Sequence, residues 1–131
     1  MSEFNSTTIR VSVIDESEEF LTVVREWISQ RPQLELAGTA NTTSAGLEMV
    51  KTVRPDLVLI EALMPSQNGF VATGELKSFD VPPRVFVLSI YDNEMLRSGA
   101  TAAGADGFVS KADFNERMPQ FLSALFDRAV A

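Results

Sequence analysis

Three carboxylates, one hydroxyl and one ammonium stand out in this 131-residue chain because they follow apolar segments of strand length. They are Asp15, Glu16, Glu61, Ser89 and Lys111. If those segments form a parallel sheet, their carboxyl ends meet at one edge and these side chains crowd together. Lys111 alone then leaves about two negative charges unbalanced, which a hard divalent cation with oxygen ligands would neutralise. The alternative is that the carboxylates are solvated groups at loop edges that bind nothing.

Composition removes several other kinds of chemistry. The chain has no Cys and no His, which excludes thiolate catalysis, imidazole bases and Cys- or His-ligated metals. Eighteen acidic residues against eleven basic ones give a net charge of −7, which disfavours direct binding to nucleic acid. No apolar run approaches the ~20 residues of a membrane span, and the polar N-terminus does not look like a signal peptide. We therefore expect a cytoplasmic protein.

Apolar segments rich in β-branched residues alternate with segments of helical periodicity. In the first of the latter, Phe20, Val24, Trp27 and Ile28 form one apolar stripe after Ser17, a good N-cap residue. The alternation predicts one α/β domain whose doubly wound parallel sheet has helices on both faces. The expected strands are Ile9–Ile14, Leu34–Ala40, Asp56–Ile60, Arg84–Ser89 and Gly107–Ser110. Later helices are expected over Thr43–Arg54, Phe70–Phe79, Asp92–Ala103 and Arg117–Ala129, with Pro119 tolerated only in the first turn of the last one.

From Ile9 to about Ala129 the sequence resembles the receiver domains of bacterial two-component response regulators, the CheY-like superfamily. The resemblance is carried by the pair Asp15-Glu16, by PDLVLI and LMPSQNG on either side of Glu61-Ala62, by Ser89, and by GADGFVSK ending at Lys111. It implies a flavodoxin-like fold with strand order 2-1-3-4-5, a flexible N-terminus over residues 1–8 and a single receiver domain over residues 9–131. It also implies signalling through proteins, not catalysis of an enzymatic reaction.

The same resemblance implies a role for each residue of the set. Glu61 occupies the phosphoacceptor position, and Ser89 and Lys111 contact phosphoryl oxygens. Mg²⁺ is held by the acidic pair, the acceptor and the backbone carbonyl of Leu63. Phe108 is the aromatic residue that changes its rotamer with the signalling state, although a residue of this kind is more often an ordinary core aromatic.

Glu61 departs from the family, which has Asp at the acceptor position. The extra methylene moves the carboxylate by about 1 Å, and a misplacement of that size can cost on the order of a hundredfold in rate. Ile90 and Tyr91 follow Ser89 where the family usually has a small residue, so they either narrow the access to Glu61 or, for Ile90, pack beneath the next helix. Ala112 replaces a common proline, which disfavours a cis peptide after Lys111.

We expect a receiver that binds a protein partner and accepts phosphoryl groups poorly or not at all. Its partner surface, by resemblance, is formed by helix four, strand five and helix five, which also serves for homodimers. The alternative is a working phosphorelay receiver that accepts phosphate slowly from a histidine kinase at Glu61 or Asp15. A flavodoxin-like redox protein or phosphatase is less favoured, because no phosphate-binding loop follows the first strand.

Overall fold

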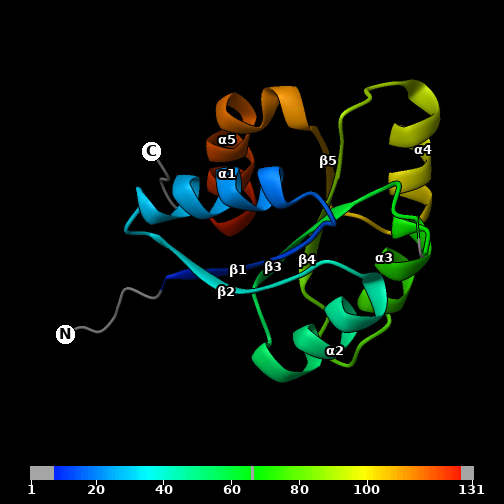
Figure 1. Cartoon of the computed structure of the whole chain (residues 1–131), viewed down its shortest axis with the longest axis horizontal. Helices are drawn as coiled ribbons and strands as arrows, with labels where there is room; N and C mark the ends of the chain where they lie inside the picture. The colour runs from blue at the N-terminus through cyan, green and yellow to red at the C-terminus, as the bar shows by residue number, and fades with distance from the viewer. Residues whose placement is uncertain (1–7, 66, 128–131) are drawn as a thin grey trace.

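The computed structural model describes residues 8–65 and 67–127 of the chain. Within them, five strands form one parallel sheet in the order β2-β1-β3-β4-β5, and five α-helices cover it (Figure 1). The doubly wound, flavodoxin-like fold is therefore confirmed. The strands are β1 (Ile9–Ile14), β2 (Leu34–Ala40), β3 (Leu57–Glu61), β4 (Arg84–Ser89) and β5 (Gly107–Ser110). The helices are α1 (Glu18–Ser29), α2 (Thr43–Val53), α3 (Gly69–Lys77), α4 (Glu94–Ala102) and α5 (Phe114–Phe126).

The helices form two layers. Helices α1 and α5 cover one face of the sheet, and α2, α3 and α4 cover the other (Figure 1). Strand β3 shows how one sequence serves both faces: Leu57 and Leu59 belong to the core under α1 and α5, and Val58 and Ile60 to the core under α2, α3 and α4. Because successive side chains of a strand point to opposite faces, a central strand must be apolar throughout.

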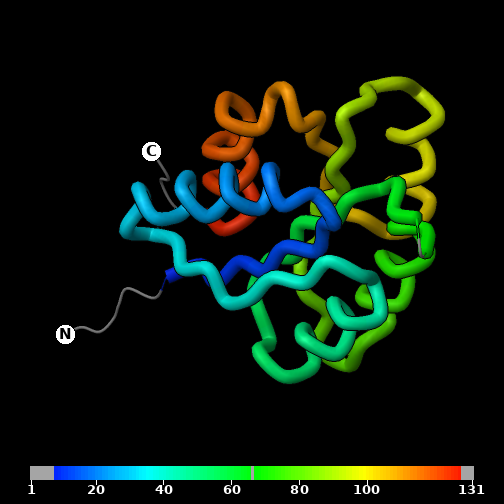
Figure 2. The backbone as a smooth tube through the Cα atoms, viewed as in Figure 1, coloured from blue at the N-terminus to red at the C-terminus, as the bar shows by residue number. Residues whose placement is uncertain are grey.

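The position of β1 between β2 and β3 determines where a site can form. Helix α1 leads from β1 to β2 on one side, and α2 leads back across β1 to β3 on the other, so the direction of winding reverses between β1 and β3. Ile14 pairs with Ile60 at the carboxyl ends of these strands, which run side by side in Figure 2. Ligands of such folds bind at this reversal point.

The prediction for the last helix was wrong at its beginning. A 3₁₀ turn over Lys111–Asp113 leads directly into α5 at Phe114, three residues before the expected start. Phe114 is buried, and its ring lies 5.4 Å from the ring of Phe20 and 5.2 Å from that of Trp27, which fixes this turn against α1. Pro119 consequently stands sixth in the helix instead of in its first turn, so it cannot donate to the carbonyl of Asn115.

Other boundaries also differ from expectation by small amounts. Helix α4 begins at Glu94, not Asp92, because Asn93 Oδ1 accepts the amide of Leu96 at 2.9 Å. Asp56 lies outside β3, where its carboxylate accepts the amide of Arg10 at 2.8 Å. The predicted cap at Ser17 is confirmed, since its Oγ accepts the amide of Phe20. Residues 1–7 of the expected flexible N-terminus and the expected end of the last helix at Ala129 lie outside the described residues.

Candidate functional site

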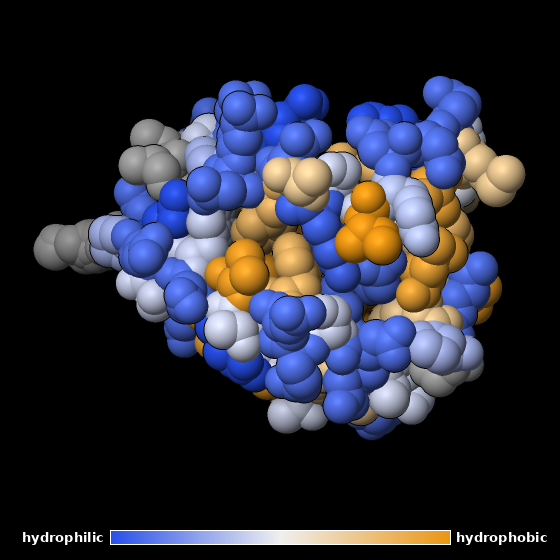
Figure 3. All heavy atoms as spheres, turned by 45° about the horizontal axis from the view of Figure 1, so that its top comes forward, coloured by the Kyte–Doolittle hydropathy of each residue, from blue (hydrophilic) through white to orange (hydrophobic). Residues whose placement is uncertain are grey.

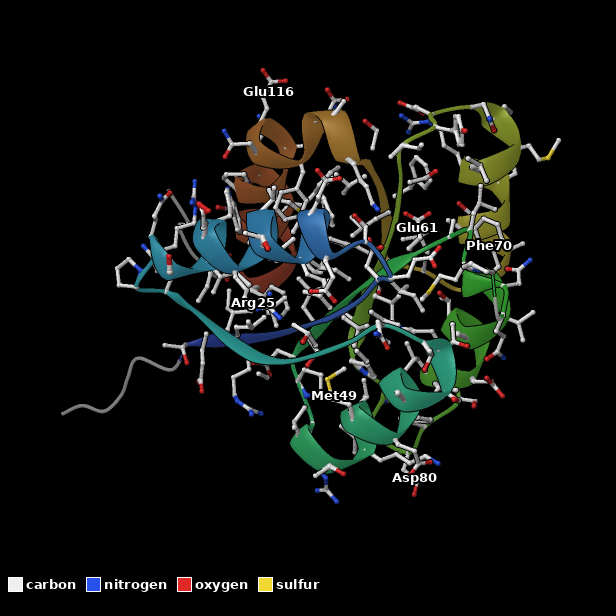
Figure 4. The ribbon with its side chains drawn as sticks, in the orientation of Figure 1. Arg25, Met49, Glu61, Phe70, Asp80 and Glu116 are labelled. Atoms are coloured by element: carbon white, nitrogen blue, oxygen red, sulfur yellow. The ribbon has the colours of Figure 1, made fainter. Side chains whose placement is uncertain are left out.

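The carboxyl edge of the sheet brings together four of the residues that sequence patterns single out. Asp15 directly follows β1, Glu61 ends β3, Ser89 ends β4, and Lys111 directly follows β5. The strand register places them in one row, because Glu61 pairs with Leu88 and Ser89 with Ser110. Figure 4 shows Glu61 where these strand ends meet. Asp15, Glu61 and Ser89 are buried.

Lys111 forms an ion pair with each of the two buried carboxylates. Its Nζ lies 2.7 Å from Asp15 Oδ2 and 2.7 Å from Glu61 Oε1. The side chains of Asp15, Glu61 and Lys111 are only 1%, 9% and 11% exposed, respectively, so water screens these pairs weakly. One ammonium thus holds both carboxylates together and balances one of their two charges.

The second oxygen of each carboxylate accepts a backbone amide two residues further along. Asp15 Oδ1 accepts from Ser17 N at 2.9 Å, and Glu61 Oε2 accepts from Leu63 N at 3.0 Å. Charged acceptors make the stronger kind of hydrogen bond, so these contacts fix both carboxylates in position. Glu61 is therefore held by Lys111 at one oxygen and by the backbone at the other.

Two opposing effects act on the pKa of Lys111. Burial disfavours the ammonium and lowers the pKa, but hydrogen bonds and charge attraction from Asp15 and Glu61 outweigh it, so the pKa lies above its ordinary value. Lys111 Nζ also lies 4.5 Å from the ring centroid of Phe20, which adds a cation–π contact. Lys111 is consequently a permanent positive charge at neutral pH.

Ser89 lines the same pocket but has a different partner. Its Oγ accepts the amide of Tyr91 at 3.0 Å. Ile90 and Tyr91, whose roles the sequence left open, are 66% and 57% exposed and line the mouth of the pocket. The alternative that Ile90 packs beneath α4 is therefore wrong. The pocket has a volume of about 310 Å³, so these side chains border it without filling it.

The expected Mg²⁺ ligands surround the pocket without forming a metal-binding arrangement. Glu16 is exposed at the rim, and the oxygens of Asp15 and Glu61 are engaged by Lys111 and backbone amides. Among residues 8–65 and 67–127, no three acidic side chains are grouped as metal ligands. Carboxylates and the Leu63 carbonyl are the right kind of donor for Mg²⁺, but as placed they do not fit the ion.

Phe108 is half-buried and packs against the core under α2, α3 and α4. The guanidinium of Arg97 lies 5.4 Å from its ring centroid, and Arg97 is paired with Asp92 at 2.7 Å. This contact between α4 and β5 was not expected from the sequence, because Arg97 and Phe108 belong to different elements. The role of Phe108 as a switch stays a prediction.

Three residues contact the site in ways that the sequence analysis did not predict: Ser17 through its amide, Leu63 through its amide and side chain, and Phe20 through its ring. The N-cap signal at Ser17 indicated only a helix start. Phe20 was recognised as a core residue, and nothing in a linear sequence indicates that the face of its ring also lies against a lysine 91 positions away. Such contacts follow from packing between α1 and the end of β5.

Comparisons with known proteins agree with this geometry. The family model of the response regulator receiver domain matches residues 11–122, and the chain belongs to this family. The chemotaxis protein CheY of Halobacterium salinarum is 32% identical over 122 residues, covering 93% of this chain and 98% of that protein. This chain is thus a CheY-like receiver domain of the two-component type. Members of this class interact with histidine kinases and other proteins and generally bind Mg²⁺.

Other relatives match over only part of their own length. The transcriptional regulatory protein NarL of Mycobacterium tuberculosis is 30% identical over 111 residues, covering 85% of this chain and 51% of that protein. The solved receiver domain of this NarL has a TM-score of 0.82 at 27% identity, covering 93% of this chain and 96% of its own. The RcsB receiver of Salmonella enterica, solved with the phosphomimetic BeF₃⁻, has a TM-score of 0.83 at 17% identity over 94% of this chain and 92% of its own, which shows the fold alone.

No helix in the described part of the chain is both long enough and apolar enough to span a bilayer.

Proposed function

We propose that this receiver signals by binding a protein partner and accepts phosphoryl groups poorly or not at all, because Glu61 stands where the family has Asp. The observation that carries the proposal is the double engagement of Glu61. Its Oε1 is paired with Lys111 at 2.7 Å and its Oε2 accepts the amide of Leu63 at 3.0 Å. A nucleophile needs an oxygen directed at the incoming phosphorus, and both oxygens here are already committed.

The additional methylene of Glu61 strengthens this argument. In-line attack depends on placing the reacting oxygen to within about 1 Å, and losing that placement costs on the order of a hundredfold in rate. The same methylene carries negative charge toward Lys111, the residue that in the family contacts a phosphoryl group. Glu61 thereby supplies part of the charge that a phosphorylated acceptor would supply, and we infer a largely fixed signalling state.

Amide NMR spectra with Mg²⁺ and BeF₃⁻, recorded for the native chain and for Glu61→Asp, test this proposal. We expect the native spectrum to stay unchanged at Ser89, Phe108 and Lys111, because Glu61 cannot place an oxygen on beryllium. The Asp variant should shift at these positions, since its carboxylate regains the family geometry. Saturable shifts of the native chain at the same three amides would contradict the proposal.

A second candidate function is slow phosphorelay from a histidine kinase. It is favoured by the open pocket, which is lined by Asp15, Ser89 and Lys111 as well as Glu61. Phosphorylation with a small phosphodonor would locate the acceptor. Label lost in Glu61→Gln but retained in Asp15→Asn would support slow acceptance at Glu61, and the reverse pattern would assign the phosphoryl group to Asp15.

The remaining proposals concern partners and setting. We propose a cytoplasmic, non-enzymatic receiver domain over residues 9–131 that has no direct contact with nucleic acid or membrane. If Mg²⁺ binds, as it generally does in this family, Asp15, Glu16, Glu61 and the carbonyl of Leu63 would hold it, and it would have to displace Lys111 first. Homodimers would use α4, β5 and α5, and sedimentation of the native chain and of Arg97→Ala would test that face.

A further inference from the structure

The mouth of the site carries an unusual amount of exposed apolar surface. Leu63, Ile90 and Tyr91 line the pocket and are 51%, 66% and 57% exposed. Met95, in the first turn of α4, is 81% exposed. Four of the seven large apolar side chains that are exposed in the described residues thus belong to the pocket rim or to the helix that follows it. Figure 3 shows apolar side chains interrupting the hydrophilic surface on the face it displays.

The pocket within this rim is negatively charged. Asp15, Glu16 and Glu61 contribute three negative charges and Lys111 one positive charge, so its lining residues sum to −2. Asp15 and Glu61 lie buried at the floor, and Glu16 is exposed at the edge. An excess of one sign inside a concave surface attracts ions of the other sign. An apolar rim around a negatively charged pocket is complementary to a positively charged group that has apolar groups around it.

We propose that this mouth docks a protein partner through a Lys or Arg side chain flanked by apolar residues. The cationic head lies at the edge of the pocket beside the exposed Glu16, attracted by the net negative charge of the lining, while Asp15 and Glu61 keep their contacts with Lys111. Its aliphatic stem and the flanking residues cover Leu63, Ile90 and Tyr91. Tyr91 also offers a ring face to a guanidinium. This inference rests on the proposed function, in which the partner recognises the site without a phosphoryl group.

Charge also argues against the other candidates for this surface. A second copy of the chain would bring a net charge of −7 and the same acidic mouth against this one. A nucleic acid or an anionic membrane would be repelled for the same reason. A basic, apolar segment of a different protein is the occupant whose charge complements the pocket.

Amide NMR titration of the full chain with three short peptides tests the inference without knowledge of the partner. The probes are acetyl-Leu-Arg-Leu-amide, the same peptide with citrulline in place of arginine, and acetyl-Ser-Arg-Ser-amide, each at millimolar concentration. We expect saturable shifts at the amides of Leu63, Ile90 and Tyr91 with the first peptide. Each of the other two should bind at least about fivefold more weakly, because each lacks one of the two complementary features.

A matched pair of variants separates docking from nonspecific association. The double variant Ile90→Ser, Tyr91→Ser should lose the shifts, and Val81→Ser should retain them. Val81 is 88% exposed but precedes β4, at the opposite end of the strand from Ile90. All three are exposed side chains, so the substitutions leave the core intact.

The inference is overturned if the first peptide gives no saturable shift, if the citrulline peptide binds equally well, or if the double variant binds like the native chain. The BeF₃⁻ experiment tests the proposed function separately from this inference. If BeF₃⁻ perturbs the native chain while the arginine peptide still binds the mouth, the fixed-state proposal fails and the docking surface stands.

Discussion

Among single residues, Lys111 is central to the site, because it pairs with two carboxylates that would otherwise face each other as buried anions. Asp15 and Glu61 each lie 2.7 Å from its Nζ. Removing one partner of a buried ion pair is costly since the remaining charge stays desolvated. The energetic importance of Lys111 is therefore separate from any role in contacting a phosphoryl group.

Lys111→Met should lower the free energy of unfolding by about 3 kcal/mol at neutral pH, because it leaves two buried carboxylates unpaired. Urea unfolding followed by far-UV circular dichroism measures this. The control is Lys51→Met, which breaks an exposed pair with Glu48 and should cost less than about 1 kcal/mol. Equal losses in the two variants would mean that the ion pairs of Lys111 contribute little.

The raised pKa of Lys111 makes the free energy of unfolding depend on pH under alkaline conditions. Burial alone would lower this pKa, but the hydrogen bonds and charges of Asp15 and Glu61 raise it. Because the pKa of Lys111 is higher in the folded chain than in the unfolded chain, its charge stabilises the fold fully at pH values below the unfolded-state pKa of about 10.4. This stabilisation is lost as the pH rises through the folded-state pKa. The native chain should thus lose more stability than Lys111→Met above about pH 10 in a series of urea titrations. Parallel pH profiles of the two proteins would contradict this.

The site residues could be predicted from the sequence to different degrees. Asp15, Glu61, Ser89 and Lys111 each end or follow an apolar segment, so a parallel sheet was enough to bring them together. The exposure of Ile90 could not be read from its type, because an apolar residue after a strand can equally well be buried. The Lys111–Phe20 contact depends on where the end of β5 lies relative to α1, which local patterns do not encode.

Among the elements, the junction between β3 and α3 controls the shape of the site. Gly69 is the first residue of α3, and its amide donates to the carbonyl of Ala62 at 2.9 Å. A Cβ at position 69 would overlap the carbonyl oxygen of Glu61 and lie 2.9 Å from the Cα of Ala62. Helix α3 can therefore begin this close to Glu61 only with glycine at that position.

Gly69→Ala should destabilise the chain by about 1–3 kcal/mol, because the backbone must shift to admit the methyl group. Gly74→Ala, in the same helix, is the matched control, since nothing lies within 4 Å of its added Cβ. That variant should be neutral or stabilised by up to about 1 kcal/mol. Thermal unfolding of both variants measures the difference, and a Gly69→Ala protein as stable as Gly74→Ala would refute the close approach.

Asp106, just before β5, connects several elements at the end of the sheet opposite the candidate site. Its Oδ2 accepts from Lys77 Nζ and from the amide of Val85, each at 2.8 Å, and Arg84 lies 3.5 Å from its Oδ1. Burial alone would raise its pKa, but these hydrogen bonds and charges outweigh burial and lower it. Its carboxylate thus joins α3, β4 and the start of β5.

Asp106→Asn should cost about 1–2 kcal/mol at neutral pH, because the charged hydrogen bond from Lys77 is lost. A lowered folded-state pKa stabilises above the unfolded value of about 4, and this term disappears as the pH falls through the folded value. The gap between native chain and variant should therefore close toward pH 3 in acid unfolding curves, about where Asp loses its charge. A stability difference between native chain and Asp106→Asn that stays constant from pH 7 to 3 would contradict this prediction. Glu48→Gln, which alters an exposed ion pair, serves as the control.

Elements of strong apolar pattern were predicted well, and those whose ends depend on tertiary contacts were not. The strands β1, β2, β4 and β5 have the expected bounds. Helix α5 begins early because Phe114 packs against Phe20 and Trp27, a contact between the two ends of the chain. Local preferences would have begun that helix nearer Pro119, whose ring suits a first turn.

At the scale of the whole molecule, the fold places the candidate site residues Asp15, Glu61, Ser89 and Lys111 at one edge of a single sheet. The order β2-β1-β3-β4-β5 puts the winding reversal between β1 and β3, which is where Asp15 and Glu61 meet. The strand order itself was inferred from resemblance to the receiver family, because periodicity predicts strands but not their neighbours. We propose that Glu61, at the acceptor position, limits what this arrangement can do.

Intact mass after incubation with Mg²⁺ and acetyl phosphate, for the native chain beside Glu61→Asp, tests the central claim most directly. We expect a phosphoryl adduct on the Asp variant and none, or only a trace, on the native chain. That result would mean that the receiver scaffold is intact and that Glu61 disables acceptance. A native chain labelled to the same extent as the variant would contradict it and would identify a working phosphorelay receiver.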